Sequence, residues 1–298
     1  MRKSLKELIE KTIIFEYKLP NSLKFIDKTI YSTENDQCYS SSDNEQLADI
    51  IYNSIIEYAF NEYELENADY QNAHSEALLT RIKFSPNKGA AVQLKHGFFG
   101  EVLLYCVLCT MHKAMPLISR GYFYNPLENS ETKGFDSYHI IEDEDKLELW
   151  CGEVKFHAKH SGGIDDALNK IDNALSDDYL NKNLLALPNN VDNFNKKSKI
   201  DTIITQWKQN PNITILEEAK KHNLKLVYPI LLLFNEGSSG YDESIKSVIK
   251  HIKDNHSTKT FSLSVELSIF FILIPVNNTK EIKTKVLEWI KANKLPMS

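Results

Sequence analysis

Hydrophobic and polar residues recur with two different periods along this chain, and each period predicts a different kind of element. From Asn44 to Phe60, apolar residues return every three or four positions, which is the spacing of one buried helix face. The same period predicts further helices at 1–12, 64–82, 92–115, 162–176, 243–253 and 280–292. Short apolar runs predict strands at 13–17, 117–124, 135–141, 147–156, 224–234 and 267–276. The Ser- and Asn-rich stretch 31–44 predicts a loop.

Helices and strands in this order predict an α/β fold in which a sheet lies between layers of helices. A chain of 298 residues is long enough for one large domain or two small ones. Pro86-Asn87-Lys88-Gly89 interrupts the pattern, so we expect an N-terminal, mostly helical region at 1–90 and a core at 91–298. Within the core, the stretch at about 178–223 is polar and rich in Asn and Lys, and it predicts a helical insertion.

The run from Leu147 to Phe156 is apolar at both parities, as in a strand that is covered on both faces. Because side chains alternate across a strand, Glu153 and Lys155 project from the same face. Burying a carboxylate and an ammonium is unfavourable unless they are paired or bind a metal. This pair is therefore the first indication of chemistry in the chain.

The Glu-x-Lys spacing alone carries little information, because it occurs six times in the sequence. The other five copies fall in predicted turns, on amphipathic helices or near polar chain edges. Only Glu153 and Lys155 lie late in a buried strand, with Asp136 on the preceding predicted strand. Glu101 is the one charged residue between Gly97 and Met111, in the most apolar predicted helix. A lone carboxylate on such a covered face must protonate, pair with a base or bind a cation.

These residue types predict the site of a metal-dependent phosphodiester hydrolase. Mg²⁺ prefers oxygen ligands and takes only one or two protein carboxylates, which leaves positions for water and a substrate phosphate. Asp136 and Glu153, with Glu101 as a third candidate, would supply these carboxylates. The metal would polarise the scissile phosphate and lower the pKa of a bound water. Lys155 would orient that water or stabilise the charge that develops in the transition state.

Composition limits the choice of partner and compartment. The net charge of −6 argues against generic nucleic-acid binding, which needs clustered Lys and Arg. Local lysine clusters occur, although a solvated surface usually explains them. The N-terminus has no apolar signal segment, and the longest apolar runs fall short of the roughly 20 residues of a membrane-spanning helix, so we expect a cytoplasmic protein. Three of the four cysteines lie in apolar runs, which is typical of reduced core thiols.

His139 follows Asp136 by three residues and has the opposite strand parity. Three roles are open for His139: it supports a residue of the site by a hydrogen bond, it contacts DNA, or it is a hydrogen-bonded structural histidine. His157, Lys159 and His160 follow the same strand as Glu153, and they meet either backbone phosphate or solvent.

A zinc site is a rival interpretation, because Cys106-x-x-Cys109 and His157-x-x-His160 have the required ligand types. The cysteines fall inside a continuous buried helix, where core cysteines are the usual case. The sequence contains no Walker-type, His-Glu-x-x-His or Gly-x-Ser-x-Gly motif. Any ATP-driven step must therefore belong to a partner.

The pattern of a helix Glu, a strand Asp and a strand Glu-x-Lys resembles the core of the PD-(D/E)XK nuclease superfamily, with Glu101, Asp136 and Glu153/Lys155 at the matching positions. The fuller motifs are similar to the HamA component of the Hachiman antiviral defence system, and the clear resemblance covers about residues 96–176. These motifs are Gly100-Glu101-x-Leu103-Leu104, Gly134-Phe135-Asp136-x-x-His139 and Trp150-x-Gly152-Glu153-x-Lys155-Phe156.

This resemblance implies a restriction-endonuclease-like mixed sheet flanked by helices. It also implies a DNA-degrading nuclease that depends on Mg²⁺, with Mn²⁺ as a substitute, and a helicase partner, HamB, which senses aberrant DNA and restrains the nuclease. Glu101, Asp136 and Glu153 would be the metal ligands and Lys155 the fourth catalytic residue. The chain departs from the superfamily pattern at Phe135, which replaces the namesake Pro, and in lacking a Gln-x-x-x-Tyr signature after Lys155. The second departure leaves the subfamily and the DNA-end preference open.

The leading hypothesis is thus a Mg²⁺-dependent deoxyribonuclease that acts in a helicase-partnered defence complex. The alternative is a catalytically inactive nuclease-fold adaptor that binds and regulates the helicase. The sequence favours the enzyme, because an adaptor has no use for Glu153 and Lys155 together on a dry strand. A restriction enzyme with its own sequence specificity would need base-reading elements, which we do not find in the sequence.

Overall fold

The computed structural model describes residues 1–26, 35–41, 43–125, 130–131, 134–143, 146–184, 202–203, 205–206, 209, 215–257 and 263–297. In these residues the main feature is a seven-stranded mixed sheet with the strand order β1-β2-β9-β8-β7-β6-β3. The strands are β1 (Ile13–Lys18), β2 (Gln37–Ser41), β3 (Met115–Pro116), β6 (Ser137–Glu142), β7 (Leu147–Phe156), β8 (Lys225–Asn235) and β9 (Leu267–Val276).

Three neighbouring pairs are parallel: β7 with β8, β8 with β9, and β9 with β2. The other three are antiparallel: β3 with β6, β6 with β7, and β1 with β2. A separate two-stranded sheet consists of β4 (Tyr124–Asn125) and β5 (Ser130–Glu131). The α/β fold class expected from the sequence is confirmed, since a mixed sheet flanked by helices is consistent with a restriction-endonuclease-like fold.

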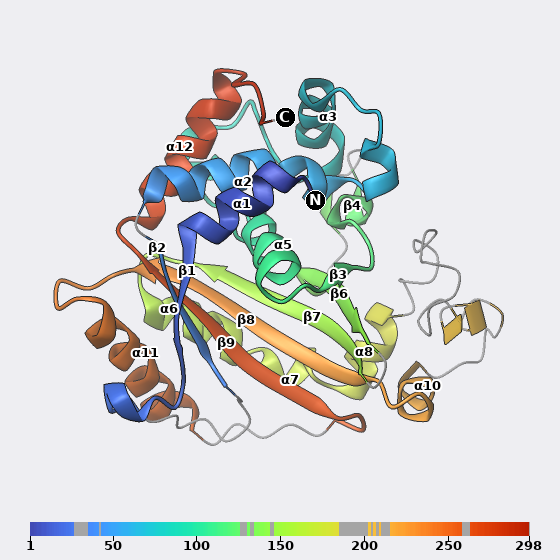
Figure 1. Cartoon of the computed structure of the whole chain (residues 1–298), viewed down its shortest axis with the longest axis vertical. Helices are drawn as coiled ribbons and strands as arrows, with labels where there is room; N and C mark the ends of the chain where they lie inside the picture. Colours follow the sequence, from blue (N-terminus) through green and yellow to red (C-terminus); the bar gives the residue numbers. More distant parts are fainter. Residues whose placement is uncertain are drawn as a thin grey trace.

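Helices cover both faces of the main sheet (Figure 1). One face, which we call the α5 face, packs against α1 (Lys3–Thr12), α2 (Asn44–Ala59), α5 (Phe98–Met111) and α12 (Thr279–Lys291). The opposite face, the α6 face, packs against α6 (His160–Leu168), α7 (Ile171–Ala174), α8 (Asp177–Leu184), α10 (Ile215–Lys221) and α11 (Tyr241–His256). Each face has its own hydrophobic core, so the central strands are buried on both sides.

In strand β7, alternate side chains enter the two opposite cores. Leu149 and Cys151 belong to the core of the α6 face, whereas Trp150 and Val154 belong to the core of the α5 face. This alternation follows from the period of two residues in a strand. It places Glu153 and Lys155 together on the α6 face. The sequence predicted that the two side chains share a face, but not which face it is.

The helix predicted for 44–60 is α2, and its start is fixed by the Asp43 carboxylate, which accepts hydrogen bonds from the backbone N–H groups of Glu45 and Gln46. Helix α5 is apolar around its whole circumference because it lies between α2 and the sheet. The run Ala90–Met111, which includes the short α4 (Ala90–Gln93), is long and apolar enough to cross a membrane by length and composition alone. In its most apolar 18-residue window, 61% of the residues are buried inside the protein.

Three sequence predictions are wrong in detail. The strand predicted for 117–124 is absent, because the Ser119 backbone N–H donates to the Asn61 side chain instead of to a strand, and a 3₁₀ turn follows at Arg120–Phe123. The segment 31–44, predicted as a loop, contains the strand β2, which is stabilised by pairing with both β1 and β9. The helix predicted for 64–82 is broken into a 3₁₀ turn, α3 (Tyr70–Glu76) and a π turn at Ala77–Arg81.

The division at residue 90 stays a prediction, and the described residues on both sides of it share one sheet and one core. Strands β1 and β2 belong to the same sheet as β7, and α2 packs with α5. The Arg2 guanidinium binds the backbone carbonyl of Met297, so the two ends of the chain lie together. Of the insertion predicted at 178–223, α8 and α10 are described, and most of 185–214 lies outside the described residues.

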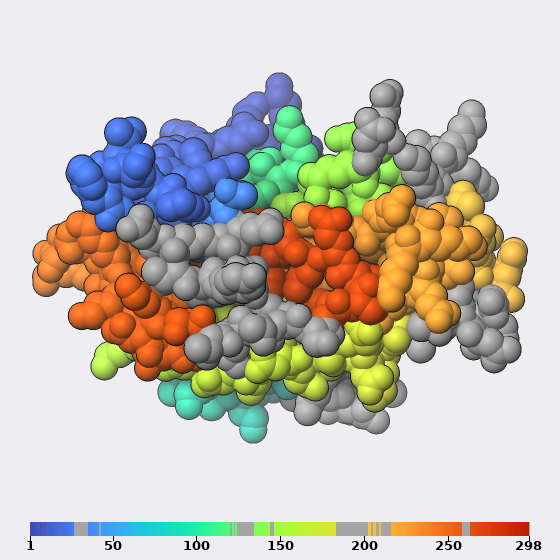
Figure 2. Space-filling view, turned by 90° about the horizontal axis from the view of Figure 1, so that it is seen from below, coloured from blue at the N-terminus to red at the C-terminus, as the bar shows by residue number. Residues whose placement is uncertain are grey.

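Viewed from below, the N-terminal residues, in blue, lie beside the orange residues of α11 (Figure 2). Asp242 at the start of α11 holds this contact, since its carboxylate is 2.9 Å from the Tyr17 hydroxyl and 3.0 Å from Lys24 Nζ. The N-terminal strand β1 is thereby attached to a helix more than two hundred residues away in sequence.

Candidate active site

Asp136 is joined to β7 on both sides of Glu153. Its backbone N–H donates to the Gly152 carbonyl, with the two atoms 2.9 Å apart. Its carboxylate accepts a hydrogen bond from the Val154 N–H, with Oδ2 2.9 Å from the nitrogen. Asp136 directly precedes Ser137, which pairs with Gly152 in the antiparallel register, and the charges of Asp136 and Glu153 both act on Lys155 and on Tyr228. Two carboxylates of the predicted site are therefore neighbours.

Lys155 lies two residues farther along β7 and forms an ion pair with the Glu153 carboxylate. The Lys155 side chain is 20% exposed and the Glu153 side chain 22%, so the pair is mostly shielded from solvent. Helix α6 covers the pair closely at Gly163. A Cβ atom at this position would lie 3.3 Å from Lys155 Cβ and 2.5 Å from a methyl group of Leu232. Only glycine allows α6 to approach the sheet this closely.

The charges around Lys155 decide its protonation. Burial acts to lower the pKa of the Lys155 ammonium, but the carboxylates of Glu153, Asp136 and Asp166 raise it, and the net result is a pKa above the usual 10.5. Lys155 is therefore a cation at neutral pH. Burial also raises the pKa of the neighbouring Tyr228 phenol well above its usual value, and the charges of Glu153 and Asp136 raise it further. These two carboxylates thus act on the same small region of the α6 face.

Glu101 has a different environment. It lies in the first turn of α5, is 7% exposed, and accepts a hydrogen bond from the Tyr58 hydroxyl of α2. The partial positive charge at the helix N-terminus also favours a carboxylate here. Helix α5 packs on the α5 face, where a Cβ at Gly100 would lie 2.9 Å from a methyl group of Val154. Glu101 is thus held by a helix on the face opposite Glu153 and Lys155.

The structure brings together Asp136, Glu153 and Lys155, but it does not gather all three predicted carboxylates. Among the described residues, one group of three metal-ligating side chains has its ligand atoms within 4.8 Å of one another, and it consists of Asp165, His251 and His256. Asp136 and Glu153 alone match the one or two hard oxygen donors that Mg²⁺ takes from a protein. The two-carboxylate site fits such a metal, and the role of Glu101 as a third ligand stays a prediction.

His139 is a buried residue of the α5 face. It is 2% exposed, its ring centre lies 5.5 Å from that of Tyr105, and its Nε2 is 3.5 Å from Cys109 Sγ. Burial lowers the pKa of His139 to about 3, so the imidazole is neutral. Of the alternatives the sequence left open, a direct DNA contact is wrong, because the side chain is inaccessible.

The zinc interpretation of the two cysteines and two histidines is not supported by the described residues. Cys106 is buried in the core of the α5 face. His157 and His160 lie across the sheet, where His157 contacts α6 near Gly163 and the His160 ring packs on Phe234. No group of three metal-ligating side chains in the described part of the chain includes either cysteine.

Two charged residues near the site were missed by the sequence interpretation. Asp166 on α6 lies 3.4 Å from His157 Nε2, and its charge adds to the raised pKa of Lys155. Lys283 on α12 donates a hydrogen bond to the carbonyl of Phe156, the last residue of β7, at 2.9 Å, and burial lowers the pKa of its ammonium to about 8. A signal for Lys283 was present, since it shares the buried helix stripe with three apolar residues: Val286, Leu287 and Ile290.

The sheet, its two helical layers and the carboxylate and lysine pair define an α/β protein with a charged site on the face covered by α6. The model of the HamA family matches residues 2–290, which is nearly the whole chain. The chain therefore belongs to the HamA family, and this membership supports involvement in Hachiman defence. A comparison with curated proteins found no match.

Proposed function

We propose that this protein is a metal-dependent DNA nuclease and the effector of a helicase-partnered Hachiman defence complex. The observation that carries the proposal is the proximity of Asp136, Glu153 and Lys155, where β6 begins beside the end of β7. Two carboxylates and a cation in this arrangement suit phosphodiester hydrolysis, in which a negatively charged phosphate must be bound and attacked by water. HamA family membership supports the same conclusion.

Asp136 and Glu153 would hold Mg²⁺, or Mn²⁺ in its place. When bound, the metal supplies a Lewis acid that polarises a phosphate oxygen and acidifies water. The bond from the Val154 N–H orients the Asp136 carboxylate, so that the ligand is held in position before the substrate arrives. Rigid support of this kind lowers the entropy that is lost when the reacting groups are brought together.

Lys155 contributes a permanent positive charge. Its raised pKa keeps the ammonium protonated across the neutral range, so it acts as a hydrogen-bond donor and not as a base. A donor placed beside the scissile phosphate stabilises the negative charge that develops in the transition state. Helix α6, which closes over Lys155 at Gly163, limits the access of bulk water to this charge.

A helicase partner is part of this proposal. The chain has a net charge of −6, and binding of DNA by phosphate contacts requires clustered positive charge. A partner that holds the DNA and supplies ATP-driven movement would deliver the strand to the site. The HamB-like helicase implied by the family is the natural candidate for this role.

The test is to incubate purified protein with supercoiled plasmid and with linear duplex, in Mg²⁺ or in EDTA, with and without the helicase and ATP. We expect degradation that depends on Mg²⁺, and a loss of about 100-fold or more in Glu153→Gln and in Lys155→Met. Glu16→Gln is the matched control, because Glu16 and Lys18 form the same Glu-x-Lys spacing on β1, at the edge of the sheet.

Equal activity in wild type and Glu153→Gln would contradict the proposed site. Absence of cleavage by wild type, even with helicase and ATP, would favour the inactive adaptor. In that case the protein should still bind the helicase, which a pull-down with the purified partner would measure.

A further inference from the structure

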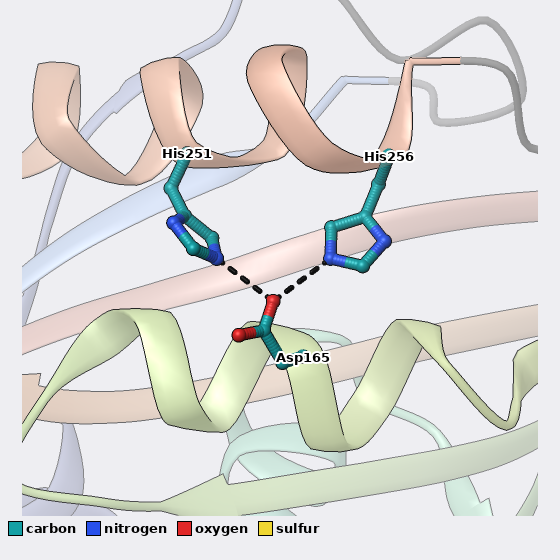
Figure 3. A group of neighbouring side chains, drawn as sticks. All are labelled: Asp165, His251 and His256. Atoms are coloured by element: carbon teal, nitrogen blue, oxygen red, sulfur yellow. Dashed lines mark hydrogen bonds and ion pairs between the residues drawn. The ribbon is translucent and has the colours of Figure 1, made fainter.

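Outside the proposed nuclease site, two histidines of α11 converge on one carboxylate of α6 (Figure 3). Oδ1 of Asp165 lies 2.8 Å from Nε2 of His251 and 2.9 Å from Nε2 of His256. The two imidazole rings point from α11 toward the same oxygen, and the three residues come from segments 86 and 91 positions apart in sequence. Among the described residues this is the one group of three metal-ligating side chains within 4.8 Å of one another.

The burial of these groups is graded. The His256 side chain is 5% exposed, that of His251 22% and that of Asp165 43%. His256 is thus fixed in the protein interior and His251 is partly covered, while the carboxylate side is open to solvent. Three protein ligands with one open side are typical of a four-coordinate metal that keeps a water.

The ligand atoms need to move little to receive a metal. Around a tetrahedral Zn²⁺ with ligand bonds of about 2.0–2.1 Å, neighbouring ligand atoms lie about 3.3 Å apart. The observed separations from the carboxylate are 2.8 and 2.9 Å, so these two must open by a few tenths of an ångström, and the two Nε2 atoms lie within 4.8 Å of each other. The Asn255 amide nitrogen donates to the His251 backbone carbonyl, 2.9 Å away, within the same helix.

The ligand types are also suitable, because the group offers two imidazole nitrogens and one carboxylate oxygen. Such a mixed nitrogen and oxygen ligand set favours a borderline transition metal over Mg²⁺ or Ca²⁺, which prefer oxygen-only sites.

We propose that Asp165, His251 and His256 form a binding site for a divalent transition metal of the zinc class, which clips α6 to α11. The site is separate from Asp136 and Glu153 and differs from them in ligand chemistry. It does not depend on the nuclease proposal, because the clip would form whether or not the chain cleaves DNA.

A metal bound between α6 and α11 would also affect Lys155, because α6 covers this residue. Helix α6 begins four residues after β7 ends, and the residue next to Asp165 is Asp166, which contacts His157 and raises the pKa of Lys155. Gly163 of the same helix lies against Lys155. A metal that holds α6 on α11 therefore also holds the cover of Lys155 in place.

The experiment uses the full chain, freed of metal by chelator and dialysis. Equilibrium dialysis against Zn²⁺ with elemental analysis should show about one bound zinc, and a melting curve should shift upward with Zn²⁺. Co²⁺ in place of Zn²⁺ should give visible absorption bands of a low-coordinate nitrogen and oxygen site. His251→Gln and Asp165→Asn should each weaken zinc binding by at least about tenfold and remove the cobalt bands.

Two controls separate this site from other zinc binding. Glu153→Gln removes a ligand of the proposed nuclease site and should bind zinc as wild type does. His222→Gln removes the histidine that directly follows α10 and should also leave zinc binding unchanged. His251→Gln tests the proposal even if His256 variants fold poorly, because His251 is the more exposed of the two histidines. The proposal is overturned if wild type binds no zinc, or if His251→Gln and Asp165→Asn bind it as tightly as wild type.

Discussion

The carboxylate of Asp136, the residue before β6, accepts a hydrogen bond from the backbone N–H of Val154 in β7, and the two residues are 18 positions apart in sequence. Asp136→Asn retains an oxygen acceptor for this N–H but removes the negative charge. We therefore expect Asp136→Asn to lose nuclease activity with little change in stability. Asp136→Ala also leaves the Val154 N–H without this acceptor, and we expect a further decrease of about 1–3 kcal/mol in the free energy of unfolding. Urea unfolding of both variants, beside the plasmid assay, separates the two effects.

Glu153 should control the protonation of Lys155. Burial alone lowers the pKa of the Lys155 ammonium, and the Glu153 charge is the largest influence that raises it. In Glu153→Gln we expect the Lys155 pKa to fall relative to wild type, which NMR titration of the labelled side chain would measure. In wild type the folded pKa lies above the unfolded value of 10.5, so the stabilisation is fully present at neutral pH and is lost only as the pH rises through the folded pKa. An unchanged Lys155 pKa in Glu153→Gln would contradict the ion pair.

Gly163 should be intolerant of a side chain. An added methyl group would meet Leu232 at 2.5 Å and Lys155 at 3.3 Å, so we expect Gly163→Ala to lower the free energy of unfolding by about 1–3 kcal/mol and to reduce nuclease activity. Gly162→Ala is a matched control in the same helix, because its Cβ would meet only His157, at an ordinary 3.6 Å. Alanine is the better helix former by about 1 kcal/mol, so Gly162→Ala should be neutral or stabilising. Equal losses in the two variants would show that the close approach of α6 is unimportant.

Glu101 and Glu153 should respond differently to Mg²⁺. A metal bound only by the folded protein raises its melting temperature, and this rise should disappear in Glu153→Gln, which removes a ligand. The hydrogen bond from Tyr58 gives Glu101 a structural role, so Glu101→Gln should keep the Mg²⁺-dependent rise while lowering the melting temperature in EDTA. Loss of the rise in Glu101→Gln as well would instead support the three-carboxylate site that the sequence predicts.

Buried histidines should make the protein sensitive to acid. Burial lowers the pKa of His139 to about 3 and those of His74 and His112 to about 4, whereas an unfolded histidine titrates near 6.5. Between these values the unfolded chain binds protons that the folded chain does not. The free energy of unfolding should therefore fall as the pH is lowered from 6.5 toward 4. Urea midpoints at pH 7, 6, 5 and 4 would measure this slope, and it should be shallower in His139→Gln than in wild type.

Strong periodicity was sufficient to predict much of the fold. Helix α2 was found nearly at its observed limits from its helical period, and strands β7, β8 and β9 from their long continuous apolar runs. Strand β2 was missed because its polar residues gave no such pattern, and its pairing with β1 and β9 supplies the stabilisation. Pairing between distant segments depends on the partner strands, which a local window does not contain.

The candidate site divides in the same way. The sequence by itself determined that Glu153 and Lys155 share a face of a buried strand, since strand alternation is a local property. It also placed Asp136 on the neighbouring strand. Only the tertiary structure decided that α5, and with it Glu101, packs on the other face, and that Asp165 meets two histidines of α11. Helix packing and side-chain convergence depend on how whole faces fit together over long sequence separations, and no local pattern of residues encodes that fit.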